Sequence, residues 1–380
     1  MIIKNNYFKT LIYELPDDCL LAIFDYVNNL DDLMNCFKVC VGWSHLIVKR
    51  TKKVKYILEY PNYTFDCVYY EGDTQIDGTC LSTLFPNVKI AEFSYRLLRK
   101  VKLEDIVAFI RHQKSLKGLI HSLEEPIEKY CGELEMVCPN DLKSNMLPNG
   151  SGIKQLRIKL GTLWDFVRNA HNFPNLERLH LYIQSPYPDR PYHSPVFEKL
   201  KIVEIDTFCP NGIIFYGFQF MDSCPNLQSA YICTKNKSLY VDVTIKHECL
   251  QDLAIEFVSI NINAIVNKIS KSQTPCVEET KKLKDEHSVK LVHILPDLVI
   301  FDVRGCREVT QRAANYVQNY FERNGRSTKF YFDGNRHEIK SDWPQLYTKR
   351  QKICRGFDFM KHCFLKDNFV LPYFLTPIDY

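Results

Sequence analysis

Sequence motifs of catalysis and metal binding are missing from this chain of 380 residues. It contains no HExxH, no GxSxG, no phosphate-binding P-loop and no glycine pattern of dinucleotide binding. Its 15 cysteines run from Cys19 to Cys363 without one CxxC pair, which argues against a zinc or redox site. We therefore expect a protein that is not an enzyme, with no catalytic residue, no cofactor and no metal.

Long apolar runs and a strong excess of one charge are missing as well. No stretch approaches the roughly 18 uncharged apolar residues that a membrane span needs, and the first residues do not form a signal peptide. The formal net charge is only +4, so composition makes nucleic acid an unlikely partner. An odd number of scattered cysteines is typical of reduced thiols. We expect a protein of the cytosol or nucleus that binds no membrane.

Three short amphipathic helices are predicted within residues 13–56. Leu20, Ile23, Phe24 and Val27 repeat with helical spacing directly after Pro16, which favours a helix start. A second apolar set with the same spacing lies between residues 33 and 40, and Asp31 is its expected cap. A third helix follows, around residues 43–47. Three helices of this length cannot bury all of their apolar surface alone, so something else must cover the rest of it.

The same segment resembles the F-box family. Leu15-Pro16, Ile23-Phe24, Asp32-Leu33, Val39-Cys40 and Trp43 follow the family pattern in order and approximate spacing. In that family the module docks on a Skp adaptor, which joins cullin and RING subunits. The contact residues that the resemblance implies are Leu15, Pro16, Leu20, Ile23, Phe24, Leu33, Val39, Cys40 and Trp43. The alternative is three ordinary helices of a helical domain.

A repeated phrase organises the rest of the chain. FPNVKIAEF at residue 85, FPNLERLHL at 173, CPNLQSAYI at 224 and LPDLVIFDV at 295 share the pattern. Weaker copies begin at residues 198 and 248, and from residue 153 onwards the apolar anchors recur every 23 to 27 residues, at Ile153, Leu176, Leu200, Leu227 and Leu250. The next anchor, Leu298, follows two periods later, so one copy is degenerate or missing between residues 251 and 298. Residues with helical spacing, such as Leu163, Phe166 and Val167, follow several of the phrases. A strand and a helix at this period predict a repeat protein.

The closing phrase LVIFDVRGCREVT resembles the cysteine-containing class of leucine-rich repeat, which commonly follows an F-box. The expected fold class is therefore an α+β or α/β repeat. It consists of a three-helix F-box and an irregular leucine-rich-repeat solenoid, with strands on the concave face and helices outside. The alternative for the second part is an irregular α/β domain.

These expectations divide the chain into five segments. They are an N-terminal tail (1–12), the F-box (13–56), a linker or atypical repeat (57–80), the solenoid (81–333) and an aromatic C-terminal cap or tail (334–380). The last segment is too aromatic to be disordered. Two uses are open for it, because it can cap the last repeat or fold back over the strand face.

The outward side chains of the strands are the candidate target site. Period-2 alternation predicts the set Arg157, Lys159, Arg178, His180, Tyr182, Glu204, Asp206, Tyr231, Asp252, Glu256, Asp302 and Arg304. The early strands are basic and the later ones mainly acidic. We expect them to bind a protein segment of complementary charge, with Tyr182 and Tyr231 as anchors. The alternative is an ordinary solvated surface.

Together the two resemblances imply a substrate-recognition subunit of a Skp/cullin/F-box ubiquitin ligase. Its F-box would dock the Skp adaptor, and its repeats would hold an unidentified protein for ubiquitination and proteasomal degradation. The alternative function is a leucine-rich-repeat scaffold, or a nucleic-acid-associated binding protein, whose F-box recruits no ligase.

Overall fold

The chain forms two compact units, Met1–Leu134 and Glu135–Tyr380, in a computed structural model. The structure describes residues 12, 15–61, 64–72, 74–140, 150–184, 195–207, 214–234, 238–239, 249–257, 284–294, 300–303, 306–335, 337–342, 351–358, 362 and 371–378. None of the helices within these ranges has the length and apolar character that crossing a membrane requires. Each unit is described separately below.

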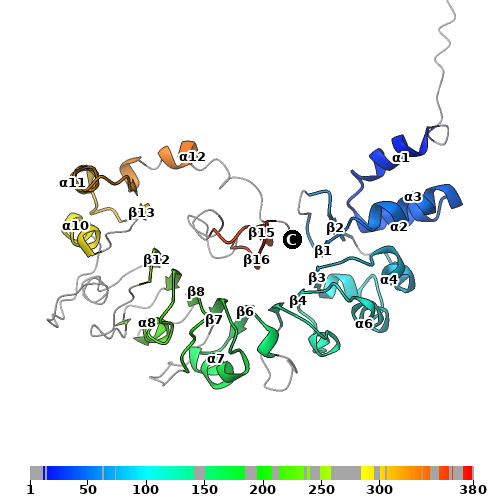
Figure 1. Cartoon of the computed structure of the whole chain (residues 1–380), viewed down its shortest axis with the longest axis horizontal. Helices are drawn as coiled ribbons and strands as arrows, with labels where there is room; N and C mark the ends of the chain where they lie inside the picture. The colour runs from blue at the N-terminus through cyan, green and yellow to red at the C-terminus, as the bar shows by residue number, and fades with distance from the viewer. Residues whose placement is uncertain are drawn as a thin grey trace, which may run out of the picture. The chain divides into compact units, whose positions relative to one another are not determined.

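The first unit begins with the three predicted helices. They are α1 (Asp17–Phe24), α2 (Leu30–Phe37) and α3 (Val41–Thr51), drawn in blue in Figure 1. Pro16 directly precedes α1, as expected, and two aspartates occupy its first turn. The cap of α2 is Asn29 rather than Asp31, because the Asn29 side chain accepts a hydrogen bond from the Asp31 amide at 2.8 Å.

Arg50 ties α3 to the end of α1. Its guanidinium is fully buried and donates from Nε to the Phe24 carbonyl at 3.2 Å and from Nη2 to Asn28 Oδ1 at 2.7 Å. Asp25 lies 3.7 Å from the same guanidinium. A cation at the carboxyl end of a helix also stabilises the last carbonyls of that helix.

Four parallel strands complete the first unit. They are β1 (Tyr56–Leu58), β2 (Cys67–Tyr69), β3 (Ile90–Phe93) and β4 (Gly118–His121), in the spatial order β2-β1-β3-β4. Helices α4 (Leu81–Leu84), α5 (Tyr95–Leu98) and α6 (Leu103–His112) and the 3-10 turn η3 (Ile127–Tyr130) lie between or after the strands. The segment 57–80 thus supplies strands to the sheet of this unit.

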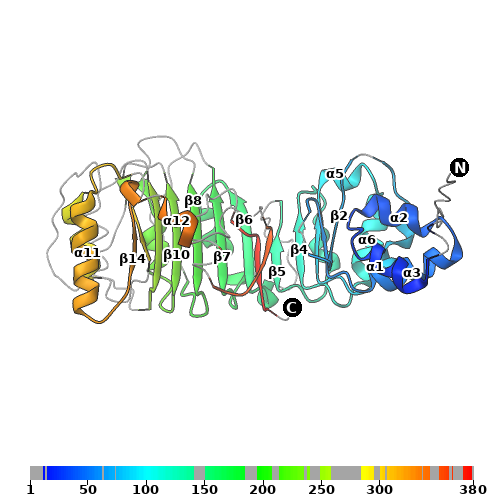
Figure 2. The ribbon, with the colours of Figure 1, turned by 90° about the horizontal axis from the view of Figure 1, so that it is seen from above.

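The second unit is built on six parallel strands. They are β5 (Met136–Cys138), β6 (Gln155–Leu160), β7 (Arg178–Ile183), β8 (Ile202–Thr207), β10 (Ser229–Thr234) and β12 (Asp252–Phe257), neighbours in that order. Figure 2 shows β6, β7, β8 and β10 side by side. Helices α7 (Leu163–Asn169) and α8 (Gly217–Met221) lie on one side of these strands. Strands β15 (Ile353–Arg355) and β16 (Phe374–Thr376), near the C-terminus, lie on the other side (Figure 1).

The remaining described elements of the second unit form smaller groups. Helices α10 (Asp285–Ile294) and α11 (Gln311–Arg323) and strands β13 (Ile300–Asp302) and β14 (Lys329–Tyr331) share one apolar core, and α12 (Glu338–Asp342) follows. Thr310 caps α11, accepting from the Arg312 amide. Strands β9 (Ile214–Phe215) and β11 (Ser238–Leu239) form a short pair, and β15 (Ile353–Arg355) pairs with β16 (Phe374–Thr376).

The predicted leucine-rich-repeat solenoid is wrong. The structure has an α/β fold with all-parallel sheets, which agrees better with the irregular α/β alternative. Strand β1 lies between β2 and β3, so strand order does not follow the chain as stacked repeats require. Strands β13 to β16 belong to separate two-stranded sheets, and the connections vary between α-helices and short 3-10 turns. The repeated phrase specifies a local turn and strand, whereas the stacking of repeats into a solenoid depends on contacts between one repeat and the next.

The phrase itself has a clear structural meaning. Asn87, Asn175 and Asn226 each donate from Nδ2 to a main-chain carbonyl 24 to 35 residues earlier, at 2.8 Å. The apolar residue two positions before each asparagine is fully buried. Each of these three copies therefore fastens the turn before a strand to an earlier segment of the chain.

Candidate functional site

The predicted adaptor-contact residues divide between the core and the surface of the three helices. Leu20, Phe24 and Leu33 are buried, and the Phe24 and Trp43 rings pack edge to face with centroids 5.0 Å apart. Leu15 and Trp43 are half-buried. The exposed members are Pro16, Ile23, Val39 and Cys40. Of the predicted contact residues, only the four exposed side chains and the half-buried Leu15 and Trp43 are accessible to another protein.

Two further apolar side chains join the exposed members. Tyr26 is 88% exposed and Val41 is 73% exposed, beside Ile23 at 42% and Val39 at 59%. Neither side chain is among the predicted contact residues, although Tyr26 lies three residues after Ile23 and Val41 follows the Val39-Cys40 motif. Large apolar side chains gathered in one short segment are typical of a protein-binding surface.

The second candidate surface is the face of β6, β7 and β8 opposite α7 and α8. Arg157, His180 and Glu204 lie at matching register positions on these three strands, as do Gln155 and Arg178 on the first two. Leu156, Leu179 and Val203 alternate with them and are buried in the core. The predicted alternation is therefore confirmed on these strands.

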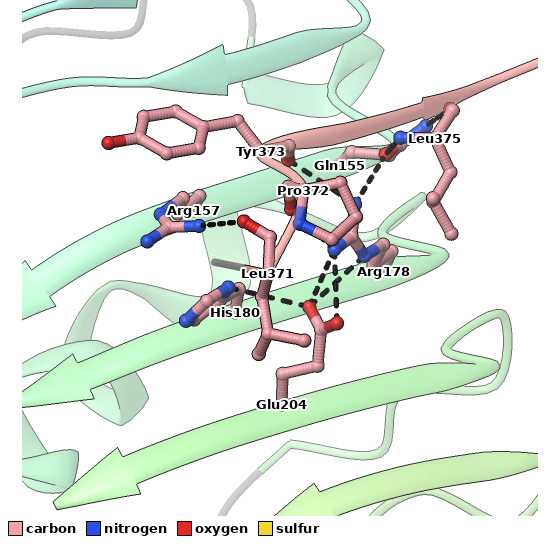
Figure 3. Close-up of polar contacts among 9 residues, drawn as sticks. All are labelled: Gln155, Arg157, Arg178, His180, Glu204, Leu371, Pro372, Tyr373 and Leu375. Atoms are coloured by element: carbon pink, nitrogen blue, oxygen red, sulfur yellow. Dashed lines mark hydrogen bonds and ion pairs between the residues drawn. The ribbon is translucent and has the colours of Figure 1, made fainter. Parts of the chain in front are cut away.

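The C-terminal tail covers this face instead of leaving it open (Figure 3). We use the name strap for residues 371–376. Arg157 Nη1 donates to the Leu371 carbonyl at 3.2 Å, and Arg178 donates to the carbonyls of Pro372 at 2.8 Å and Tyr373 at 3.3 Å. The Gln155 amide exchanges two hydrogen bonds with the main chain of Leu375. Of the two uses left open for the tail, the strap matches the one that covers the strands.

A buried ion pair lies beneath the strap. Arg178 Nη2 and Glu204 Oε2 are 2.8 Å apart, and a second pair of atoms, Nη2 and Oε1, is at 3.0 Å. Arg178 is 3% exposed and Glu204 is fully buried. His180 Nδ1 lies 3.5 Å from the same carboxylate. These side chains, predicted as solvent-facing target contacts, are therefore enclosed by the protein itself.

The predicted tyrosine anchors have different surroundings. Tyr231 is buried against Ile202, Leu371 and Leu375 and so packs under the strap. Tyr182 is half-buried, and burial of its ring together with the nearby Asp206 raises the pKa of its phenol. Asp206 is itself buried.

The rim of this face is partly exposed and consists of basic and aromatic side chains. Lys159 is exposed, with its Nζ 6.0 Å from the Tyr182 ring centroid. The Arg157 guanidinium lies 3.9 Å from the centroid of the Tyr373 ring, and Lys352 Nζ lies 5.3 Å from it. Strand residues and tail residues together build this rim.

The acidic end of the predicted site is only partly described. Asp252 accepts a hydrogen bond from Ser229 Oγ at 2.7 Å, and burial raises the pKa of its carboxyl. Glu256 and Asp302 belong to β12 and β13, but their side chains lie outside the described part of the chain, and Arg304 lies outside the described residues entirely. The predicted charge gradient is therefore tested only as far as Asp252.

One buried acid–base pair lies in the first unit. His121 Nε2 and Glu128 Oε2 are 2.7 Å apart, and both side chains are buried.

Burial, with Glu128 nearby, raises the pKa of the Cys131 thiol to about 12, which disfavours a reactive thiolate. Within the described ranges, no cluster of three or more His, Cys, Asp or Glu side chains has the arrangement of a metal site.

The chain was compared with protein-family models and with curated proteins. No family model matches the chain, and no curated protein is significantly similar to it.

Proposed function

We propose that the protein is the target-recruiting subunit of a Skp/cullin/F-box ubiquitin ligase, acting in the cytosol or nucleus. The observation that carries the proposal is a set of exposed apolar side chains in the N-terminal helical segment: Ile23 and Val41 on helices, and Tyr26 and Val39 in the turns between helices. In this proposal they dock on a Skp-family adaptor, which brings the cullin and RING subunits.

The division of the helical residues supports docking through a surface rather than through the core. Leu20, Phe24 and Leu33 already fill the interior of the three helices. The helices can therefore dock on a partner without exposing their core. Covering an exposed Ile or Val contributes about 1.5 to 3 kcal/mol when it becomes fully buried. A few such residues supply a stable interface, provided that the partner offers a complementary apolar surface.

The second unit supplies the surface for the target in this proposal. The rim formed by Arg157, Lys159, Tyr182 and Tyr373 combines cations with amphipathic rings, as protein interfaces often do. In this proposal the role of the second unit is to bind the target.

Adaptor capture by the purified full-length chain tests the proposal. A purified Skp-family adaptor should be retained by the wild-type chain. The single variants Ile23→Asp and Val39→Asp should each weaken retention at least about tenfold, because they place a charge where an apolar contact is lost. The matched control is Val196→Asp, which changes an equally apolar side chain, 66% exposed, in the second unit.

The control should retain the adaptor as the wild type does. Circular dichroism should show unchanged helix content in every variant, because all three positions are exposed. Absence of adaptor binding by the folded wild-type chain, or equal binding by all variants, would reject the proposal and favour a scaffold that recruits no ligase.

A further inference from the structure

The strap lies on β6 and β7 as an extended peptide lies in a binding site (Figure 3). Five hydrogen bonds connect it to Gln155, Arg157 and Arg178, and each ends on a main-chain atom of the strap. Contacts of this kind recognise an extended backbone and leave the choice of side chains to separate pockets.

Two leucines supply the side-chain part of the contact. Leu371 and Leu375 are buried and pack with Ile202 and Tyr231 of β8 and β10. Pro372 and Phe374 are also buried, whereas the Tyr373 ring stacks on Arg157 at the rim. The strap thus presents leucines four residues apart, with a proline and two aromatic residues between them.

The polar character of the covered face does not suit a permanent cover. Replacing a buried ion pair by apolar residues of similar volume is often neutral or stabilising, so a fixed cover needs no charges beneath it. Here Arg178 and Glu204 pair with each other and still leave guanidinium hydrogens directed at the strap carbonyls. This arrangement equips the face to bind main chain.

We propose that this face is a peptide-binding surface whose internal ligand is the strap. In trans it accepts an extended partner segment of the same chemistry, with leucines four residues apart flanking a proline and two aromatic residues. That the partner segment belongs to the ligase target rests on the proposed function. The existence of a peptide-binding surface does not.

Competition by the strap limits binding in trans. A tethered segment acts at an effective concentration on the order of millimolar, so a free peptide with equal contacts occupies the face only rarely. Weakening the strap raises the fraction of open protein, and the apparent affinity for the peptide rises in proportion.

Fluorescence anisotropy with a labelled peptide of residues 371–378 tests the inference on the full-length chain. The wild type should bind the peptide weakly. The double variant Leu371→Asp/Leu375→Asp should bind at least about tenfold more tightly, because its own strap can no longer seat both leucines. The milder variant Leu371→Ala should give an intermediate affinity and serves if the double variant fails to fold.

A peptide with aspartate in place of both leucines is the matched control and should bind neither variant. Failure of the folded Leu371→Ala chain to bind better than the wild type would overturn the inference. So would equal binding of the control peptide, or a concentration-dependent dimer that binds no peptide, since the strap would then exchange between two copies. Adaptor capture is measured in a separate experiment. A failure of the proposed ligase function can therefore be told apart from a failure of peptide binding.

Discussion

A buried arginine–glutamate pair sits where the strand face meets the strap. The pair is strongly desolvated, and its net effect depends on both partners being present. Alternation along the strands indicated which residues share this face. It did not indicate that Arg178 and Glu204 satisfy each other across neighbouring strands, because the pairing register is a tertiary property.

Removing one partner should therefore cost more than removing both. Glu204→Leu leaves the Arg178 guanidinium buried without its carboxylate, and we expect a loss of about 3 to 5 kcal/mol in the free energy of unfolding. The double variant Arg178→Met/Glu204→Leu should lose clearly less. Urea unfolding followed by circular dichroism measures both, and equal losses would show that the pair is not energetically coupled.

Residue exposure also changes which substitutions are informative in the helical module. The family pattern implies contact roles for Leu20 and Phe24, but both side chains lie in the core. Polar replacements there would unfold the module, and loss of adaptor binding would then have two explanations. Ile23 and Val39 avoid this ambiguity because they are exposed.

The turn before each strand is the element that the repeated phrase encodes. In the second copy, Asn175 Nδ2 donates to the Ser151 carbonyl at 2.8 Å, and Asn175 Oδ1 accepts from Lys199 Nζ at 2.7 Å. The asparagine thus connects the turn before β6 to the turn before β8. Apolar spacing predicted the strand at this place, whereas the hydrogen bond between copies required the structure.

Replacing this asparagine should weaken the second unit by a modest amount. We expect Asn175→Ala to lower the free energy of unfolding by about 1 kcal/mol, the usual contribution of a hydrogen bond that is partly open to water. His171→Ala, at an exposed position four residues earlier, is the matched control and should change little. Indistinguishable urea midpoints for the two variants would contradict the proposed role of the asparagine.

At the scale of the whole molecule, the proposed function requires both units on one chain. The N-terminal helices would bring the ligase, and the second unit would bring the target. Loss of the adaptor contact should therefore leave target capture intact while stopping target turnover.

This separation can be measured in cells that express the full-length chain. Proteins captured while the proteasome is blocked should fall in abundance when the block is removed. With Val39→Asp they should still be captured but should persist, because no ligase is recruited. With Val196→Asp they should turn over as with the wild type. Captured proteins whose abundance is the same with Val39→Asp and with the wild type would indicate a scaffold.

Much of the local structure of this protein can be predicted from its sequence alone. Helical spacing and Pro16 located the N-terminal helices, and period-2 alternation located β6, β7 and β8, because both signals depend on neighbours in the chain. The sequence did not determine the fold class, since a turn-and-strand phrase is compatible with several sheet arrangements. Nor did it place Leu371 and Leu375 on Tyr231, because contacts between residues so distant in sequence carry no local signal. Only the tertiary structure decided that the strap occupies the predicted target face.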